Sequence, residues 1–76
     1  MIKLLTFEMD DENKIEIHAN KDGLKYLIDE LNNLYSSDKN EHYHLMTPAW
    51  GGNELTEEKQ NENSNLINHV KIMLWH

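Results

Sequence analysis

Residues 20–35 have the most regular apolar spacing in the sequence, and this spacing predicts an amphipathic helix. Asn20 is a suitable N-cap, because its short side chain can accept hydrogen bonds from the free N–H groups of the first turn. The polar run that follows Tyr35 ends the helix. The apolar positions follow the i, i+3, i+4, i+7 pattern of a single stripe, which consists of Leu24, Leu27, Ile28, Leu31 and Leu34.

A β-hairpin is predicted before this helix. Residues 2–8 carry apolar side chains at both odd and even positions, which indicates a strand that is buried on more than one side. Residues 14–18 alternate strictly, with Ile15 and Ile17 on one face. A turn of about five residues separates the two segments, so we expect them to pair antiparallel.

Two further strands are predicted after the helix, at residues 41–47 and 66–74. Residues 53–65 lie between them and carry four glutamates and one lysine, which predicts an exposed, mobile loop. The order β-β-α-β-β predicts an α+β fold. We expect a small two-layer sandwich, in which one helix packs on a mostly antiparallel four-stranded sheet. A chain of 76 residues is expected to form a single domain, residues 1–76.

The charge balance favours a basic protein partner. The chain has 14 acidic residues, seven lysines and no arginine, so its field would repel nucleic acid and it lacks the side chain that best binds phosphate. The absence of cysteine fits a reducing cytoplasm, and we expect a cytoplasmic protein. No apolar run approaches the roughly 18 residues of a membrane span, so no membrane partner is expected.

A second face of the predicted sheet is rich in histidine. We expect the helix to cover the face that carries Ile15, Ile17, Tyr43, Leu45, Val70 and Ile72. The opposite face would then carry Glu16, His18, His42, His44, Met46, His69, Met73 and Trp75.

This face has two interpretations. His42 and His44 project the same way from one strand, and His18, His69 or Glu16 could complete a tetrahedral metal site with them. Histidine, methionine and tryptophan also suit a half-buried surface that packs against the 48–65 loop, a second copy of the chain or another protein. The second interpretation requires no special chemistry and is preferred, so we expect no cofactor.

No motif indicates catalysis. Ser36, Ser37 and Ser64 lie in polar segments without a supporting base. Gly51-Gly52 is not a phosphate-binding loop, because no Lys-Ser/Thr follows it. A chain of this length also offers little volume for a pocket that excludes water, so we do not expect an enzyme.

Residues 42–55 carry the most specific pattern in the chain, H-x-H-L-x-T-x-x-W-G-G-x-E-L. Together with the helix and with residues 65–75, it resembles immunity protein family 32, a group of small bacterial proteins that accompany polymorphic toxins. The resemblance covers about the last three-quarters of the chain. The matching residues are His42, His44, Leu45, Thr47, Trp50, Gly51, Gly52, Glu54 and Leu55.

The resemblance implies a protein that neutralises a cognate toxin by binding it, and it supplies no active-site residues. The acidity of the chain fits a basic toxin, because complementary charge speeds encounter. Trp50 has two interpretations: it plugs the edge of the core while the glycines allow a turn, or it anchors a partner. The candidate partner-binding residues are Trp50, Glu54, Glu57, Glu58, His42, His44 and Trp75.

Two other functions are open at this point. The chain could be a small homodimeric structural or regulatory domain that pairs through the histidine face or a free strand edge. It could also be a metal-binding protein that uses His18, His42, His44 and His69.

Overall fold

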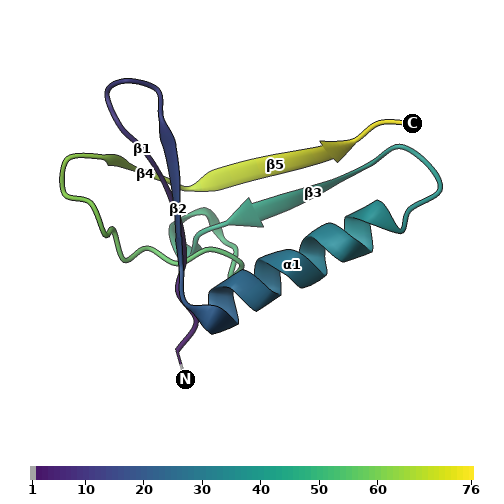
Figure 1. Ribbon diagram of the computed structural model, residues 1–76, viewed down its shortest axis with the longest axis horizontal. Helices are drawn as coiled ribbons and strands as arrows, with labels where there is room; N and C mark the ends of the chain where they lie inside the picture. Colours follow the sequence, from purple (N-terminus) through teal and green to yellow (C-terminus); the bar gives the residue numbers. More distant parts are fainter. Residues whose placement is uncertain (1) are drawn as a thin grey trace.

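The α+β fold class predicted from the sequence is confirmed. The computed structural model describes residues 2–76, which form strands, an α-helix and a short 3-10 helix (Figure 1). The elements in chain order are β1 (Leu5–Met9), β2 (Ile15–Ala19), α1 (Lys21–Tyr35), β3 (Glu41–Met46), η1 (Pro48–Trp50), β4 (Asn65–Ile67) and β5 (His69–Leu74).

The strands form two antiparallel sheets, whereas the sequence predicted one sheet of four strands. The three-stranded sheet has the order β2-β1-β4, and the two-stranded sheet pairs β3 with β5. The predicted last strand is divided at Asn68, whose carbonyl and side-chain oxygens accept hydrogen bonds from the N–H and hydroxyl of Thr47. The chain therefore leaves one sheet at β4 and enters the other at β5. In Figure 1, β1 and β2 run up the view, whereas β3 and β5 run across it above α1.

The predicted start of α1 is confirmed at Asn20. Its side-chain oxygen accepts hydrogen bonds from the N–H of Gly23, at 2.8 Å, and from the N–H of Leu4, at 3.0 Å. The first bond caps the helix and the second ties it to the segment that leads into β1. The direction in which the helix leaves the three-stranded sheet is thereby fixed.

The core lies where α1 meets both sheets, and it buries less of α1 than the sequence predicted. Its buried apolar side chains are Leu5, Phe7, Leu27, Leu45 and Leu55. Leu24, Ile28 and Leu31 were expected to be buried in the same stripe as Leu27, but they are nearly half exposed. A two-stranded sheet is too narrow to cover so wide a helix face. Ile15 and Ile17 are also about half exposed, because β2 is an edge strand.

Residues 55–64 are fastened to the three-stranded sheet, although residues 57–60, 62 and 63 are exposed as the sequence predicted. Leu55 and Ser64 are buried, and the hydroxyl of Thr56 accepts a hydrogen bond from the N–H of Leu5 at 2.9 Å. Figure 1 shows this segment on the side of the sheet away from α1 and β5. We call residues 56–64 the covering loop.

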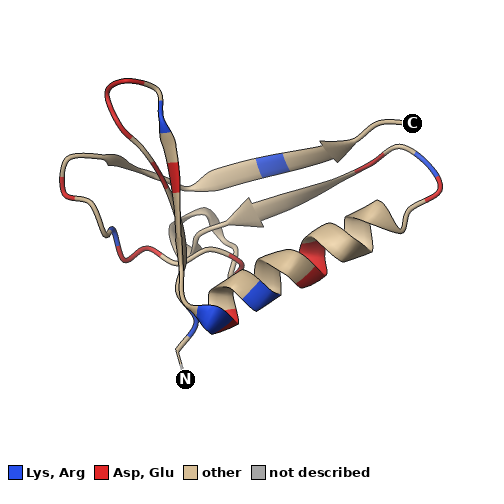
Figure 2. Cartoon of the chain, in the orientation of Figure 1, with Lys and Arg blue, Asp and Glu red and all other residues tan. Residues whose placement is uncertain are grey.

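Charge is unevenly distributed along the fold. Figure 2 shows acidic residues at the turn between β1 and β2 and along the covering loop, whereas α1 carries both signs. Figure 2 also shows acidic residues beside a lysine in the connection from α1 to β3, so acidic residues lie at both ends of the molecule. Within residues 2–76, the structure contains no helix that is long and apolar enough to cross a membrane.

Candidate functional site

The outer face of the two-stranded sheet is open and carries three of the predicted histidines. The register pairs His42 with Met73, His44 with Lys71, and Met46 with His69, so these residues share one face. Leu45 points to the other face and is buried in the core beside Leu27. The outer face is therefore directed away from the helix, as the alternation in the sequence predicted for this pair of strands.

Four rings on this face form a continuous line, which we call the ring row: His42, His44, His69 and Trp50. The centroids of His42 and His44 are 5.0 Å apart with the rings edge to face. His44 and His69 are also 5.0 Å apart, and Nδ1 of His44 lies 2.7 Å from Nε2 of His69. Trp50 completes the row, with its ring centroid 5.8 Å from that of His69.

The surroundings of His44 in the ring row favour its neutral form. Partial burial, followed by the proximity of His69 and His42, lowers the pKa of His44 from its ordinary value of 6.5. The short contact between His44 and His69 needs one nitrogen to donate and the other to accept, which two fully protonated rings cannot do. His44 therefore favours the neutral state, and the row presents a largely aromatic surface.

Trp50 is 58% exposed, so the expectation that it plugs the core is wrong. Leu55, which is 1% exposed, fills that part of the core. Pro48 starts η1, and Gly51 ends it with φ +89°, a conformation that glycine adopts without strain. Gly52 does not have a positive φ, but a Cβ there would lie 2.6 Å from the carbonyl oxygen of Met46. The turn therefore needs Gly51 for its positive φ and Gly52 because a side chain there would clash with the backbone of Met46.

Two of the predicted acidic residues support the loop that presents Trp50. Glu54 accepts a hydrogen bond from the N–H of Met46 at 2.9 Å, and Glu57 accepts one from the N–H of Ala49 at 2.6 Å. Glu58 is exposed in the adjoining covering loop. Trp75, which follows β5, is 68% exposed at the far end of the sheet from Trp50. The candidate binding residues thus extend along the length of the two-stranded sheet.

The candidate metal ligands are divided between the two sheets. His42, His44 and His69 lie together in the ring row, whereas His18 lies on β2 beside Glu16. The sequence did not single out the residue that joins this second group. Within residues 2–76, the one set of three potential ligands whose atoms all lie within 4.8 Å of one another is Glu8, Glu16 and His18.

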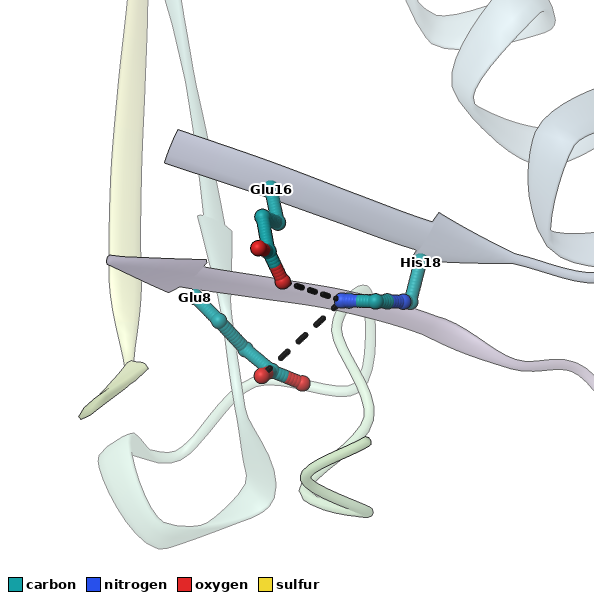
Figure 3. A group of neighbouring side chains, drawn as sticks. All are labelled: Glu8, Glu16 and His18. Carbon is teal, nitrogen blue, oxygen red and sulfur yellow. Dashed lines mark hydrogen bonds and ion pairs between the residues drawn. The ribbon is translucent and has the colours of Figure 1, made fainter. Parts of the chain in front are cut away.

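Figure 3 shows these three side chains on the outer face of the three-stranded sheet, where β1 and β2 pair. Nε2 of His18 lies 2.9 Å from Glu16 and 3.9 Å from Glu8. The carboxylate of Glu8 is fully buried and accepts hydrogen bonds from the N–H groups of Gln60 and Asn61 and from the hydroxyl of Ser64. We call Glu8 and these three donors the Glu8 clamp, because they fasten the covering loop to β1.

Both glutamates of this group favour the ionised state. Burial raises the pKa of Glu8, but the hydrogen bonds from Gln60, Ser64 and Asn61 outweigh it and hold the pKa below 4.5. The hydrogen bond from His18, followed by that from Asn61, lowers the pKa of Glu16. Two carboxylates and an imidazole are ligands that a divalent cation could use. Glu8, however, is already engaged by the covering loop, so the geometry of this group matches a structural role.

The Glu8 clamp left little signal in the sequence. Glu8 stands two positions after Thr6 in a strand that is otherwise apolar, and both residues face the covering loop. That spacing is the available signal, because it indicates that one face of β1 is polar. The donors lie in a segment without periodicity, so their partner could not be identified in advance.

Comparison with known proteins identifies the family. The sequence model of the family described as Immunity protein 32 matches residues 14–70, which contain the ring row and the covering loop. The match agrees with the resemblance found in residues 42–55. Searches of curated proteins and of solved structures found no match. Because the family model matches well over half of the chain, the chain belongs to the immunity protein 32 family.

Proposed function

We propose that this chain neutralises a cognate bacterial toxin by binding it directly in the cytoplasm, without catalysis and without a cofactor. The observation that supports this proposal most strongly is the ring row, an exposed line of four aromatic rings beside an acidic loop. Membership of an immunity protein family supplies the class of partner, a protein toxin. The candidate contact residues remain Trp50, Glu54, Glu57, Glu58, His42, His44 and Trp75.

The ring row has the properties of a protein-binding surface. Tryptophan is enriched among the residues that contribute most to binding, and Trp50 and Trp75 are both mostly exposed. The rings of the row support one another, so Trp50 loses little side-chain freedom when a partner covers it. Residues 2–76 enclose no pocket, which favours a macromolecular partner over a small molecule.

The acidic residues favour a basic toxin. Glu57 binds the N–H of Ala49 through Oε2, and Glu58 is exposed in the adjoining segment. Their charge lies close to Trp50 in the chain and adds to the acidic residues of the covering loop. Opposite charge on the toxin would speed association, and like charge on other proteins would oppose it. The proposed partner therefore carries lysine or arginine around an apolar depression that receives Trp50.

The test uses the toxin encoded beside this chain and compares Trp50→Ala with Ile15→Ala. Ile15 is a matched control, because it is 54% exposed but lies on β2 of the other sheet. We expect Trp50→Ala to keep the circular dichroism spectrum of the wild type and to weaken toxin binding at least about tenfold, as loss of an interface anchor does. Ile15→Ala should bind normally.

Two results would contradict parts of the proposal. If wild-type protein neither binds the toxin nor protects cells that express it, the proposed function is wrong. If the toxin binds wild type but tolerates Trp50→Ala, Trp75→Ala and the double variant, the function stands and the ring row is not the contact surface. Binding is measured by titration calorimetry, and protection is measured by growth on co-expression.

A further inference from the structure

Helix α1 carries an apolar stripe that its own core covers only in part. The stripe consists of Leu24, Ile28, Leu31 and Tyr35, which are 48%, 46%, 43% and 82% exposed. Successive members are four, three and four residues apart, which is the a/d spacing of a seam between two packed helices.

The stripe lies on a different side of α1 from the residues that face the core. Gly23, Leu27 and Leu34 are buried. Because successive residues are about 100° apart on a helix, the exposed stripe is centred about 90° away from this buried line. The helix can therefore pack on the two-stranded sheet and on a second helix at the same time. The ring row remains accessible, because it occupies the opposite face of that sheet.

The charges beside the stripe are complementary to an antiparallel copy of the same helix. Lys21 lies at the start of α1, and Asp38 follows its end. When two copies run antiparallel with Ile28 opposite Leu31, Leu24 lies opposite Tyr35. Lys21 of one copy then reaches the C-terminal end of the other helix, and Asp38 lies in the turn that follows this end. The last turn, Asn32-Asn33-Leu34-Tyr35, contains no basic residue, so a lysine from a second copy would also offset the negative end of the helix dipole.

The net charge of −7 does not prevent such pairing. Figure 2 places the acidic turn between β1 and β2 and the acidic covering loop away from α1. Of the acidic residues in the middle of the helix, Asp29 forms an ion pair with Lys25. At physiological salt, charges separated by more than about 8 Å are largely screened. A second copy is also present wherever the chain is made, whereas a toxin is not. Exposed apolar stripes promote aggregation unless they are covered, so a permanent cover fits this one.

We propose that the chain forms a homodimer through antiparallel pairing of the exposed stripe of α1 with the same stripe of a second copy. The interface is isologous, as in most two-fold dimers. It is independent of the proposed toxin contact and leaves one ring row free on each subunit.

The first test is the mass of the purified full chain in solution, measured by light scattering and by sedimentation over a concentration series. We expect a dimer of twice 9.0 kDa. Ile28→Glu should raise the dimer dissociation constant at least about tenfold, because it places a charge in the apolar seam. Met73→Glu is the matched control: Met73 is also 46% exposed but lies on the outer face of the other layer, and its substitution should leave the dimer unchanged.

A second set of variants keeps the proposal testable if Ile28→Glu does not fold. Lys21 and Asp38 are exposed, so reversing either charge should not disturb the fold. Lys21→Asp and Asp38→Lys should each weaken the dimer, and the double variant should restore it. A wild-type chain that remains monomeric at its highest soluble concentration would overturn the proposal, as would a dimer that neither charge reversal affects.

Disulfide trapping tests the orientation of the helices, because the chain has no cysteine of its own. A mixture of Leu24→Cys and Tyr35→Cys chains should form a covalent heterodimer on mild oxidation. Each variant alone should remain largely uncrosslinked. If Leu24→Cys crosslinks to itself in preference to Tyr35→Cys, the helices run parallel and the proposed seam is wrong.

Discussion

The two sheets each have an outer face that carries histidine, but only one of these faces is covered by another segment of the chain. On the three-stranded sheet, Glu8 and Thr6 lie under the covering loop and bind its backbone and hydroxyl groups. On the two-stranded sheet, the ring row has no segment of chain over it in residues 2–76, and its rings bind one another. The covering loop covers the outer face of the three-stranded sheet, whereas the outer face of the two-stranded sheet remains exposed.

This contrast shows that residue type alone does not separate structural groups from binding groups. His18 and His44 both stand in alternating strands beside another polar residue, yet His18 binds Glu16 near the Glu8 clamp and His44 stacks in the open. Within residues 2–76, every buried side-chain nitrogen and oxygen has a hydrogen-bond partner. Polar groups under the covering loop are therefore expected to govern stability, and exposed rings are expected to govern binding.

Glu8→Ala should cause the largest loss of stability. The substitution leaves the N–H groups of Gln60 and Asn61 and the hydroxyl of Ser64 without their acceptor. We expect the free energy of unfolding to fall by about 3 kcal/mol, as measured by urea denaturation. Glu12→Ala, in the exposed turn between β1 and β2, is the control and should change it by less than about 0.5 kcal/mol. Equal effects of the two substitutions would contradict a structural role for the Glu8 clamp.

Acid should also lower the free energy of unfolding, but by less than Glu8→Ala does. The pKa values of Glu8 and Glu16 are lowered by folding, so their contribution to stability is fully present above about pH 4.5 and is lost as pH falls through the lowered values. The loss should be smaller than for Glu8→Ala, because a protonated carboxyl still accepts some of the hydrogen bonds. Urea denaturation between pH 7 and pH 3 measures it. In Glu8→Gln this dependence should be reduced; an unchanged dependence would exclude Glu8 as its source.

Thr56→Val should lower the free energy of unfolding by a still smaller amount. It retains the shape of the side chain but removes the oxygen that accepts from the N–H of Leu5 and bonds the hydroxyl of Thr6. We expect a loss of about 1.5 kcal/mol in urea denaturation. Ser37→Ala is the control, because the hydroxyl of Ser37 bonds only near the surface, to Lys39. A neutral Thr56→Val would show that the hydroxyl of Thr56 does not help to hold the covering loop.

The smallest effect on stability is expected from substitutions in the ring row, on the outer face of the two-stranded sheet. His69→Ala removes a ring that contacts both His44 and Trp50, and exposed substitutions of this kind usually change stability by less than about 0.5 kcal/mol. It should nevertheless raise the pKa of His44 toward its ordinary value of 6.5, because part of the lowering comes from His69. Titration by NMR measures this shift. An unchanged His44 pKa would show that the two rings do not interact in solution.

Local sequence signals were sufficient to predict the fold class, the N-cap of α1 and the outer face of the two-stranded sheet. Asn20, the alternation around Leu45 and the apolar spacing around Leu27 are all local signals. Local signals did not predict the break at Asn68, because it depends on Thr47, which lies 21 residues earlier in the chain. They also placed Leu24, Ile28 and Leu31 in the core, since sequence spacing gives the width of an apolar face but not the width of the sheet that covers it.

The site was predicted less completely than the fold. The ring row could be anticipated in part, because His42, His44 and His69 alternate along two strands that were expected to share a face. The exposure of Trp50 could not be anticipated, since a tryptophan next to a glycine turn is equally compatible with burial. The Glu8 clamp was missed because its donors lie in a segment whose composition resembles that of a disordered loop.

The Glu8 clamp also has a consequence for the order in which the chain folds. Its hydrogen bonds join residues that are 52 to 56 positions apart, whereas the β1–β2 hairpin and α1 need only local contacts. Closing a long loop requires an entropy loss before any of its contacts form. We therefore expect the covering loop to dock after the rate-limiting barrier, so Glu8→Ala should accelerate unfolding while leaving the refolding rate nearly unchanged.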